Sequence, residues 1–275
     1  MIPADFALFA RLLKERSGLA LGAEKSYLLE SRLVPVARKH GLASVAELAA
    51  VLRTRLDAET VRDIVEAMTT NESFFFRDIK PFEQFRTIVL PYLLKARAQK
   101  RTIRIWSAAC AAGQEPYSLA MLLADEEARL AGWHVDLVAS DLSSEMIERA
   151  RAGIYTQFEV QRGLPIRYLV RDFEPEGDHW NLKPAIRERV QFRTANLLEE
   201  PMGWGRFDVI LCRNVLIYFE RGTKTAVLER LARHLTPDGF LILGGAETTL
   251  GVTSKLEPLA DQRGLYRLAA AAVGV

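Results

Sequence analysis

The sequence contains few cysteines and histidines, and their scarcity excludes several kinds of protein. Among 275 residues there are two cysteines, Cys110 and Cys212, and four histidines without the spacing of metal ligands. Two cysteines cannot build a disulfide scaffold or a cysteine-based zinc site. We therefore expect no metal, and we expect both cysteines to be small core residues in a reducing compartment.

The sequence also lacks long apolar runs and an excess of charge of one sign. No run approaches the roughly 20 residues of a membrane helix, and the early charges at the amino terminus do not fit a signal peptide. A formal net charge of +2 argues against a protein that wraps nucleic acid. These features predict a cytoplasmic protein with no nucleic-acid partner and no direct membrane insertion. Because 49% of the residues are hydrophobic, the chain can bury a substantial core.

Residues 1–69 predict an all-helical domain, because apolar residues recur at helical spacing and no strand pattern interrupts them. We expect the first helix to end near Gly18 and the second to be kinked by Pro35. Ser44 followed by Glu47 predicts a capping box at the start of a third helix. A fourth helix completes the domain.

Residues 70–100 are expected to form a linker and a connecting helix. The three consecutive phenylalanines Phe74–Phe76 do not fit an amphipathic helix. At least one of them is interpreted as part of a hydrophobic plug between domains, with the neighbouring polar residues free to face a pocket. A long helix is predicted from Pro81 onward, with Pro91 bending or ending its first part.

Residues 101–275 alternate between strand and helix patterns, which is typical of a parallel sheet with helices on both faces. The predicted strands are 102–109, 134–141, 190–197, 206–214 and 239–245, with a short terminal strand near 264–268, and the predicted helices include 116–130 and 223–235. The interval 154–189 is too long for a bare loop, and its prolines and glycines predict a small inserted subdomain.

The turn after the first predicted strand indicates which kind of ligand the sheet binds. It reads Ala108-Ala-Cys-Ala-Ala-Gly113, with one glycine where a dinucleotide fingerprint needs three. Gly113 provides the backbone freedom for a sharp turn, and Pro116 suits the first turn of the following helix. This turn is poor for NAD but adequate for a nucleoside without phosphate, such as S-adenosylmethionine.

Polar residues at the carboxyl ends of the strands are candidates for cofactor binding, because ligands of doubly wound sheets bind there. Asp141 can accept hydrogen bonds from both hydroxyls of a ribose. It could instead cap the following helix, although Ser143 competes for that role. Asn214 could simply stabilise a turn, and Tyr218 could be a core residue.

Eight segments, in order along nearly the whole chain, resemble the CheR family of chemotaxis receptor methyltransferases. These segments are Tyr27-Leu-Leu-Glu-Ser-Arg-Leu, Thr70-Asn-Glu-Ser-Phe-Phe-Phe-Arg, Trp106-Ser-Ala-Ala-Cys, Glu115-Pro-Tyr-Ser, Ala139-Ser-Asp, Ala150-Arg-Ala-Gly-Ile-Tyr, Asn196-Leu-Leu and Cys212-Arg-Asn-Val-Leu-Ile-Tyr-Phe. Single pieces such as Ala-Ser-Asp carry no weight, but together they are highly specific.

The resemblance implies a doubly wound class I S-adenosylmethionine-dependent methyltransferase sheet with a small inserted β-subdomain, preceded by an all-helical N-terminal domain. It implies methyl transfer to glutamate carboxylates of chemoreceptors in chemotaxis signalling, with S-adenosylhomocysteine as the product. Together with Gly113, the cofactor-binding residues that it implies are Asn71, Ser73, Arg77, Glu115, Asp141, Asn196, Leu197, Arg213 and Asn214. It also implies that Arg77 and Tyr218 serve catalysis and that Arg32 and Arg38, on a basic second helix, approach the receptor.

The sequence departs from the family pattern in the inserted segment. Residues 161–165 read Gln-Arg-Gly-Leu-Pro, in place of the glycine-rich loop of members that bind a receptor's C-terminal pentapeptide. We therefore expect a pentapeptide-independent enzyme, a monomer without a fused repeat domain. The alternatives are an S-adenosylmethionine-dependent methyltransferase of another acidic or small-molecule substrate, and a non-catalytic sensor of S-adenosylmethionine or S-adenosylhomocysteine.

Overall fold

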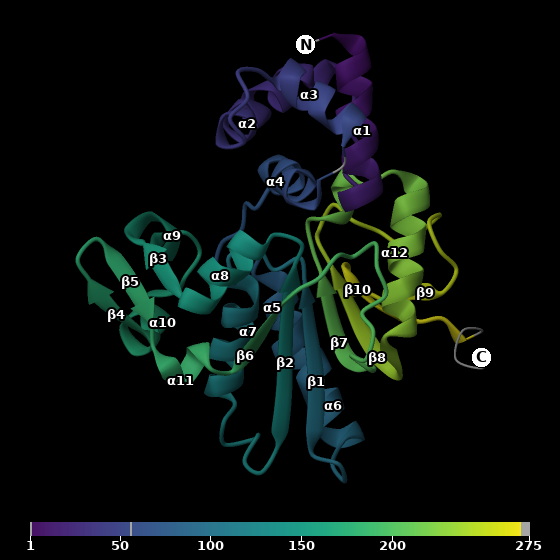
Figure 1. Cartoon of the computed structure of the whole chain (residues 1–275). Coiled ribbons are helices and arrows are strands. Elements are labelled where there is room, and N and C mark those ends of the chain that lie inside the picture. The colour runs from purple at the N-terminus through teal and green to yellow at the C-terminus, as the bar shows by residue number, and fades with distance from the viewer. Residues whose placement is uncertain (1, 56, 271–275) are drawn as a thin grey trace. The chain divides into compact units, whose positions relative to one another are not determined.

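The computed structural model describes residues 2–55 and 57–270, and these form two compact units (Figure 1). The first unit contains the described part of Met1–Thr70 together with Tyr218–Thr223. The second contains Asn71–Ile217 and the described part of Lys224–Val275. None of the helices in the described residues is both long and apolar enough to span a bilayer.

The first unit is helical, as predicted. Its elements are α1 (Pro3–Ser17), the 3₁₀ turn η1 (Ala23–Lys25), α2 (Ser26–Lys39), α3 (Val45–Thr54) and α4 (Ala58–Met68). Gly18 ends α1 in the left-handed conformation, at a φ of 79°. Ser44 caps α3 by accepting from the Glu47 N–H, but the Glu47 carboxylate accepts from the Ala43 N–H, so the reciprocal bond of the predicted capping box is absent. Pro35 lies inside α2, which continues to Lys39.

A segment from late in the sequence completes this helical unit. Phe219 forms an antiparallel bridge with Leu19, and the Ala20 N–H donates to the Tyr218 carbonyl at 3.0 Å. Lys14 Nζ lies 2.6 Å from a carboxylate oxygen of Glu220. These contacts hold residues 218–220 against the turn that follows α1.

The second unit is built on a seven-stranded sheet with the order β6-β2-β1-β7-β8-β10-β9. Its strands are β1 (Thr102–Ala108), β2 (His134–Asp141), β6 (Val190–Thr194), β7 (Phe207–Cys212), β8 (Leu235–Leu243), β9 (Leu256–Pro258) and β10 (Leu265–Leu268). The first five strands in this order are parallel, whereas β10 is antiparallel to β8 and β9. The strand order reverses between β1 and β7, which places a binding crevice at their carboxyl ends.

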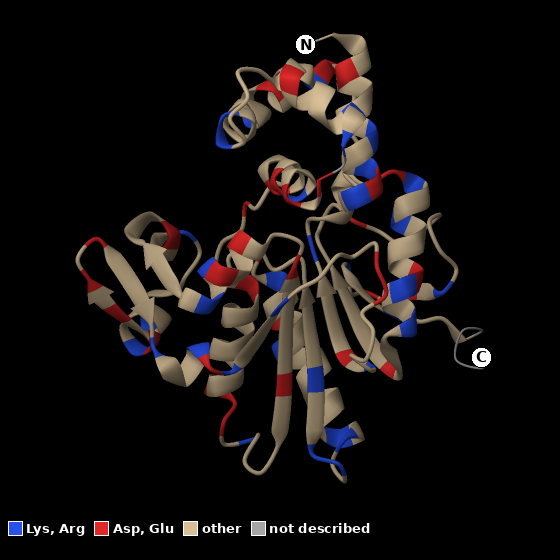
Figure 2. Cartoon of the chain, in the orientation of Figure 1, with Lys and Arg blue, Asp and Glu red and all other residues tan. Residues whose placement is uncertain are grey.

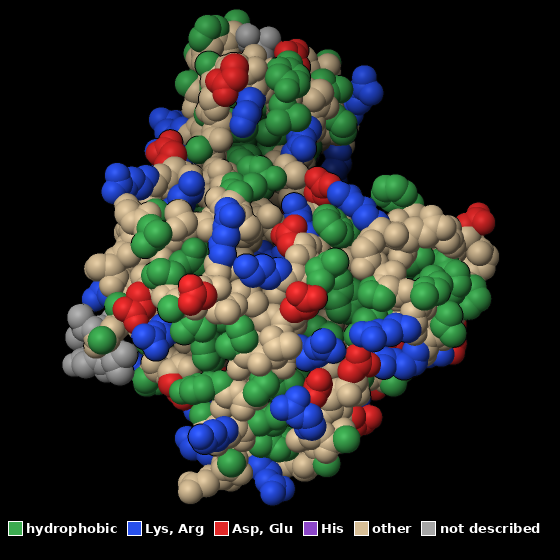
Figure 3. Space-filling model, turned by 180° about the vertical axis from the view of Figure 1, so that it is seen from behind, with side chains coloured by type: hydrophobic (Ala, Val, Ile, Leu, Met, Phe, Trp, Pro, Cys, Tyr) green, Lys and Arg blue, Asp and Glu red, His purple; other side chains and the backbone are tan. Residues whose placement is uncertain are grey.

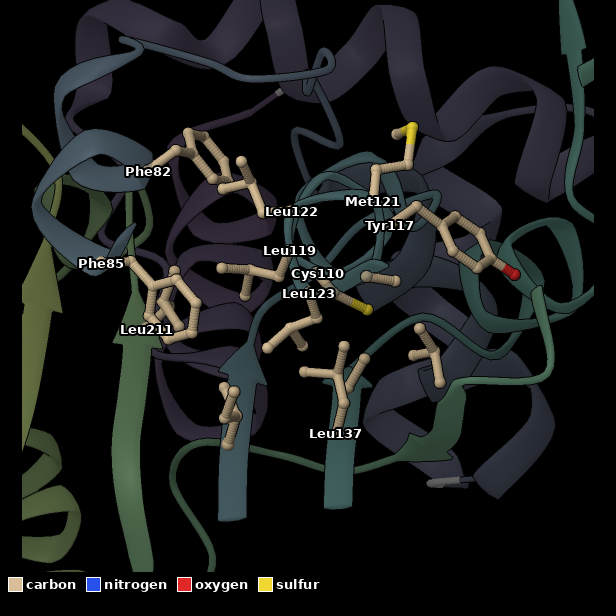
Figure 4. Packing of buried hydrophobic residues seen from close by; sticks show 14 of the residues in the cluster. Phe82, Phe85, Cys110, Tyr117, Leu119, Met121, Leu122, Leu123, Leu137 and Leu211 are labelled. Atoms are coloured by element: carbon tan, nitrogen blue, oxygen red, sulfur yellow. The ribbon is translucent and has the colours of Figure 1, made fainter. Parts of the chain in front are cut away.

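Helices cover this sheet, and hydrophobic side chains fill the space between. The covering helices are α5 (Lys80–Gln84), the π-helical turn η2 (Phe85–Val89), α6 (Leu90–Ala96), α7 (Gln114–Asp125), α8 (Ser144–Ala152) and α12 (Arg221–Arg233). Figure 4 shows Phe82 and Phe85 gathered with Leu119, Leu122 and other apolar side chains of α7 beside the strands. The π turn directly precedes Pro91, which cannot donate to the fourth carbonyl before it. The predicted long helix is therefore continuous, but its backbone hydrogen bonds change from the α-helical to the π-helical pattern at η2.

The inserted segment forms a small subdomain with an antiparallel sheet in the order β3-β5-β4. Its elements are β3 (Ile154–Thr156), α9 (Gln157–Gln161), α10 (Ile166–Asp172), β4 (Phe173–Glu176), β5 (His179–Leu182) and α11 (Pro184–Arg187). Phe75 packs edge-on against Tyr155 with ring centroids 4.9 Å apart, and Phe76 stacks on Tyr168 at 5.0 Å. Phe75 and Phe76 are thus core residues of the sheet unit, not a plug between domains.

The strands of the sheet and the outer surface of its unit differ in the side chains that they carry. Each strand of the seven-stranded sheet carries one or two charged residues, and Figure 2 shows isolated red and blue bands on otherwise tan strands. Two of these residues pair across neighbouring strands, since Arg104 Nε of β1 donates to Asp136 of β2 at 2.9 Å. The outer surface of the subdomain differs, since Phe158, Ile166 and Val170 are each at least 70% exposed. The space-filling view shows exposed hydrophobic side chains among charged ones on the surface of the molecule (Figure 3).

Candidate active site

Strained backbone gathers in three segments around the carboxyl ends of β1 and β7. Eight non-glycine residues of the described ranges have a positive φ, and six of them lie in the linker after α4, the turn after β1 or the residues after β7. These six are Phe76, Asp78, Ile79, Ala109, Ala111 and Asn214. Such conformations persist only where surrounding contacts hold them, and they concentrate at functional sites.

A buried ion-pair network joins these segments. Arg213, directly after β7, has a side chain that is 2% exposed. Its Nη1 donates to Glu115 Oε2 at 2.7 Å, and its Nη2 donates to the Arg77 carbonyl at 2.7 Å and to Asp78 Oδ2 at 2.9 Å. The second oxygen of Glu115 accepts from Ser107 Oγ at 2.8 Å. One guanidinium therefore connects β1, α7, β7 and the linker.

The linker residues predicted to reach the cofactor belong to the same unit as this network. Asn71, Ser73 and Arg77 are half-buried. Arg77 Nη1 donates to the Glu72 carbonyl at 2.8 Å, and the Arg77 guanidinium lies 5.4 Å from the ring centre of Phe74. Within the described residues, the Asn71 and Ser73 side chains neither accept nor donate a protein hydrogen bond.

Asp141, at the end of β2, is buried and organises the turn after β1. Its Oδ2 accepts from the Ala111 N–H at 2.8 Å, and its Oδ1 accepts from the Ser143 N–H at 3.0 Å. Ser143 itself caps α8 by accepting from the Met146 N–H. The capping role that competed for Asp141 therefore falls to Ser143.

Asn196 and Leu197 follow β6 on the neighbouring side of the crevice. Asn196 Oδ1 accepts from the Leu198 N–H at 3.0 Å, and the Leu197 carbonyl accepts from Arg230 at 2.7 Å. Both residues line a cavity of about 200 Å³, together with Trp106 and Ser140. The loop after β6 therefore borders open space.

Glu247 is a site residue that we did not predict from the sequence. It lies in the loop after β8, is buried, and accepts four backbone N–H groups at 2.7–3.0 Å. Three of these belong to Asn214, Val215 and Leu216, and the fourth belongs to Gly244. A Cβ at position 244 would fall 2.8 Å from Glu247 Oε2, so glycine is needed there. The sequence did offer one signal for Glu247, which is an acidic residue just beyond the carboxyl end of a strand.

We predict that Glu247→Gln disorders the loop that carries Asn214. The amide group would replace an acceptor oxygen with a donor facing backbone N–H groups, at a cost of about 2–4 kcal/mol in unfolding free energy. Chemical denaturation measures this cost, and Glu257→Gln in an exposed ion pair with Arg267 provides the control. Equal stability of the two variants would contradict the assigned role.

Three predicted residues belong to the helical unit. Tyr218 contributes its carbonyl to the bond with Ala20. Arg32 Nη1 donates to the Met68 and Thr69 carbonyls at 2.9 and 3.0 Å, so its guanidinium caps the end of α4. Arg38 is exposed on α2.

Both cysteines are buried in the sheet unit, where burial raises the pKa of each thiol well above its ordinary value. They are therefore poor nucleophiles. Within the described residues there is no group of three or more His, Cys, Asp or Glu able to hold a metal.

The donor set at the crevice fits a zwitterionic amino-acid group joined to a nucleoside. Two buried side-chain atoms there, Gln114 Oε1 and Arg213 Nε, have no hydrogen-bond partner among the described residues. An acceptor such as Gln114 Oε1 suits an ammonium group, and a donor such as Arg213 Nε suits a carboxylate. With the doubly wound sheet and the single-glycine turn, these features define a class I S-adenosylmethionine-dependent methyltransferase.

Comparison with known proteins identifies the family. Residues 4–69 match the all-alpha domain of CheR methyltransferases, and residues 71–265 match their S-adenosylmethionine-binding domain. Chemotaxis protein methyltransferase 1 of Pseudomonas aeruginosa is 45% identical over 249 residues, covering 89% of this chain and 90% of that protein. The chemotaxis protein methyltransferase of Vibrio parahaemolyticus is 40% identical over 268 residues, covering 96% of each chain. The chain belongs to the CheR methyltransferase family.

Proposed function

We propose that this chain is a chemotaxis protein methyltransferase that forms methyl esters on glutamate side chains of chemoreceptors. Its relatives carry the name chemotaxis protein methyltransferase and match nearly the whole chain. The single observation that carries the proposal is the buried Arg213 network. It fixes the linker bearing Arg77 at the carboxyl edge of a sheet that binds S-adenosylmethionine.

The chemistry requires alignment more than proton transfer. When bound, S-adenosylmethionine would supply a methyl group on a cationic sulfur, which a glutamate carboxylate could accept with S-adenosylhomocysteine as the leaving group. A glutamate with a pKa of about 4.3 is already ionised at neutral pH, so no strong general base is needed. Orientation and partial drying of the carboxylate supply the acceleration.

We assign some residues of the crevice to binding the cofactor and others to orienting the substrate carboxylate. The proposed cofactor-binding residues are Asn71, Ser73, Arg77, Gly113, Glu115, Asp141, Asn196, Leu197, Arg213 and Asn214. Arg213 acts on the amino-acid end of the cofactor and also holds the Arg77 backbone. Arg77 steadies the cofactor or the incoming carboxylate, and Tyr218 orients that carboxylate through its hydroxyl. Arg32 and Arg38 are proposed to approach the receptor, with Arg38 the more accessible.

We predict that Tyr218→Phe slows methyl transfer about tenfold while leaving cofactor affinity nearly unchanged, because a hydrogen bond to a charged group is lost. Steady-state kinetics and titration calorimetry separate the two quantities. Tyr92→Phe removes another partly exposed hydroxyl, bonded to Asp238, and serves as the control. Equal turnover in Tyr218→Phe and the wild type would make Tyr218 a structural residue.

We further propose that the enzyme acts as a monomer in the cytoplasm and needs no pentapeptide tether on the receptor. Support for the missing tether comes from residues 161–165, which read Gln-Arg-Gly-Leu-Pro in the inserted segment in place of the glycine-rich loop of tether-binding members. A receptor lacking its C-terminal residues is therefore expected to be methylated as fast as the intact one.

Label transfer from methyl-labelled S-adenosylmethionine to chemoreceptor-rich membranes tests the proposal. We expect label on receptor bands that is released by mild base, as a methyl ester requires, and we expect Arg77→Ala to abolish it. Label that survives base, or that appears in small molecules, would indicate another methyltransferase. Cofactor binding with no label in any fraction would indicate a sensor.

A further inference from the structure

The inserted subdomain contacts the linker through the turn between α9 and α10. Gly163 in this turn has a φ of 84°, and a Cβ there would fall 2.2 Å from the Phe75 carbonyl oxygen. The neighbouring Arg162 donates through Nη2 to Glu72 Oε1 at 2.6 Å. The turn therefore lies directly on the linker backbone, and its position depends on glycine at residue 163.

Arg162 and Arg77 contact the same two residues, Glu72 and Phe74, although the two arginines lie far apart in the sequence. The Glu72 carboxylate accepts from Arg162, and the Glu72 carbonyl accepts from Arg77 at 2.8 Å. The guanidinium carbons of Arg162 and Arg77 lie 4.5 and 5.4 Å from the ring centre of Phe74. The bond from Arg162 also holds the pKa of Glu72 below its ordinary value, so this carboxylate stays charged at neutral pH.

Other bonds fix the backbone of this linker but leave the Arg77 side chain to these shared partners. Arg213 holds the Arg77 carbonyl, and Ser118 Oγ accepts from the Phe76 N–H at 2.9 Å. Among the described residues, the Arg77 guanidinium has Glu72 and Phe74 as its only neighbours through a hydrogen bond or a ring contact. Whatever orders these two residues also orders Arg77.

We propose that Arg162 is a positioning residue of the methyl-transfer reaction: by holding Glu72 and Phe74, it fixes the Arg77 guanidinium at the active site. The inference rests on the proposed function, in which Arg77 steadies the cofactor or the incoming carboxylate. It also makes the inserted subdomain part of the catalytic apparatus, since a displacement of the turn at residues 162–163 is transmitted to Arg77 through two shared contacts.

The alternative role for an arginine that is 40% exposed is direct docking of the acidic receptor. The two roles differ in kinetics. A docking residue changes the receptor KM, whereas a positioning residue changes kcat, because misplacement of a reactive group affects the chemical step.

Steady-state methyl transfer by three variants tests the inference. We expect Arg162→Ala to lower kcat about tenfold at a receptor KM within about twofold of the wild type. Arg162→Lys retains a cation near Glu72 and Phe74 and is expected to recover part of the loss. Arg189→Ala removes a different surface arginine, whose partner Glu127 lies 3.5 Å away, and is expected to match the wild type. Thermal unfolding checks that all three variants are folded.

A double-mutant comparison separates positioning from a general loss of packing. If Arg162 acts through Arg77, then Arg162→Ala has little further effect on S-adenosylhomocysteine affinity or kcat in an Arg77→Lys background. Wild-type kcat in Arg162→Ala, a raised KM at unchanged kcat, or additive effects in the double variant would each overturn the inference. Absence of transfer by the wild-type enzyme would instead contradict the proposed function.

Discussion

Replacement of Arg213 by alanine is expected to lower the unfolding free energy of the protein by about 3–5 kcal/mol and to abolish methyl transfer. The side chain is almost fully buried between Glu115 and Asp78. Its removal leaves the Glu115 carboxylate in the interior without its cation, and releases the Arg77 carbonyl from its donor. Chemical denaturation measures the first effect, and the label-transfer assay measures the second.

The matched control for this prediction is Arg267→Ala. Arg267 forms an ion pair with Glu257 in the same unit, but both side chains are more than one-third exposed. Surface pairs of this kind contribute about 0–1 kcal/mol. If the two variants lose similar stability, the Arg213 network is not the internal connection described above.

Replacement of Asp141 by alanine is expected to weaken binding of S-adenosylhomocysteine by about 10- to 100-fold. The carboxylate is the proposed partner of the ribose hydroxyls, and it also holds the Ala111 N–H that shapes the turn after β1. Loss of the partner for the ribose and loss of the acceptor for the Ala111 N–H both weaken binding of the ligand. Titration calorimetry gives the affinity directly.

Asp136→Ala provides the control for Asp141. Asp136 lies on the same strand but pairs with Arg104, away from the carboxyl end. Its loss is expected to affect stability and to leave affinity for S-adenosylhomocysteine unchanged. Unchanged affinity in Asp141→Ala as well would exclude the ribose assignment.

Periodicity and chain order sufficed to predict the two kinds of fold in this chain. The helices of residues 1–69 and the parallel strands follow from apolar spacing, which burial dictates locally. Strand β9 escaped prediction because three residues ending in Pro258 carry too short a pattern. The inserted subdomain was expected from its length, but its sheet order depends on contacts between residues far apart in sequence.

The candidate site was predictable where a residue follows directly from a strand end, and not where it acts through another residue. Glu115, Asp141 and Arg213 could be named because strand ends meet at one edge of the sheet. Glu247 also follows a strand end, but its role depends on bonds to backbone groups 31 to 33 residues away, which the sequence alone does not reveal. Arg162 carried no such signal, because its role depends on a side chain 90 residues away. The plug interpretation is wrong for Phe75 and Phe76 for the same reason, since the rings of the subdomain that pack against them are far along the chain.

The most direct test of the central claim is a crystal structure of the protein grown with S-adenosylhomocysteine. The account predicts the ligand at the carboxyl ends of β1, β2 and β6, with its ribose on Asp141 and its amino-acid end near Arg213. Density for the ligand elsewhere, or a crevice filled by protein side chains around Arg213, would contradict it.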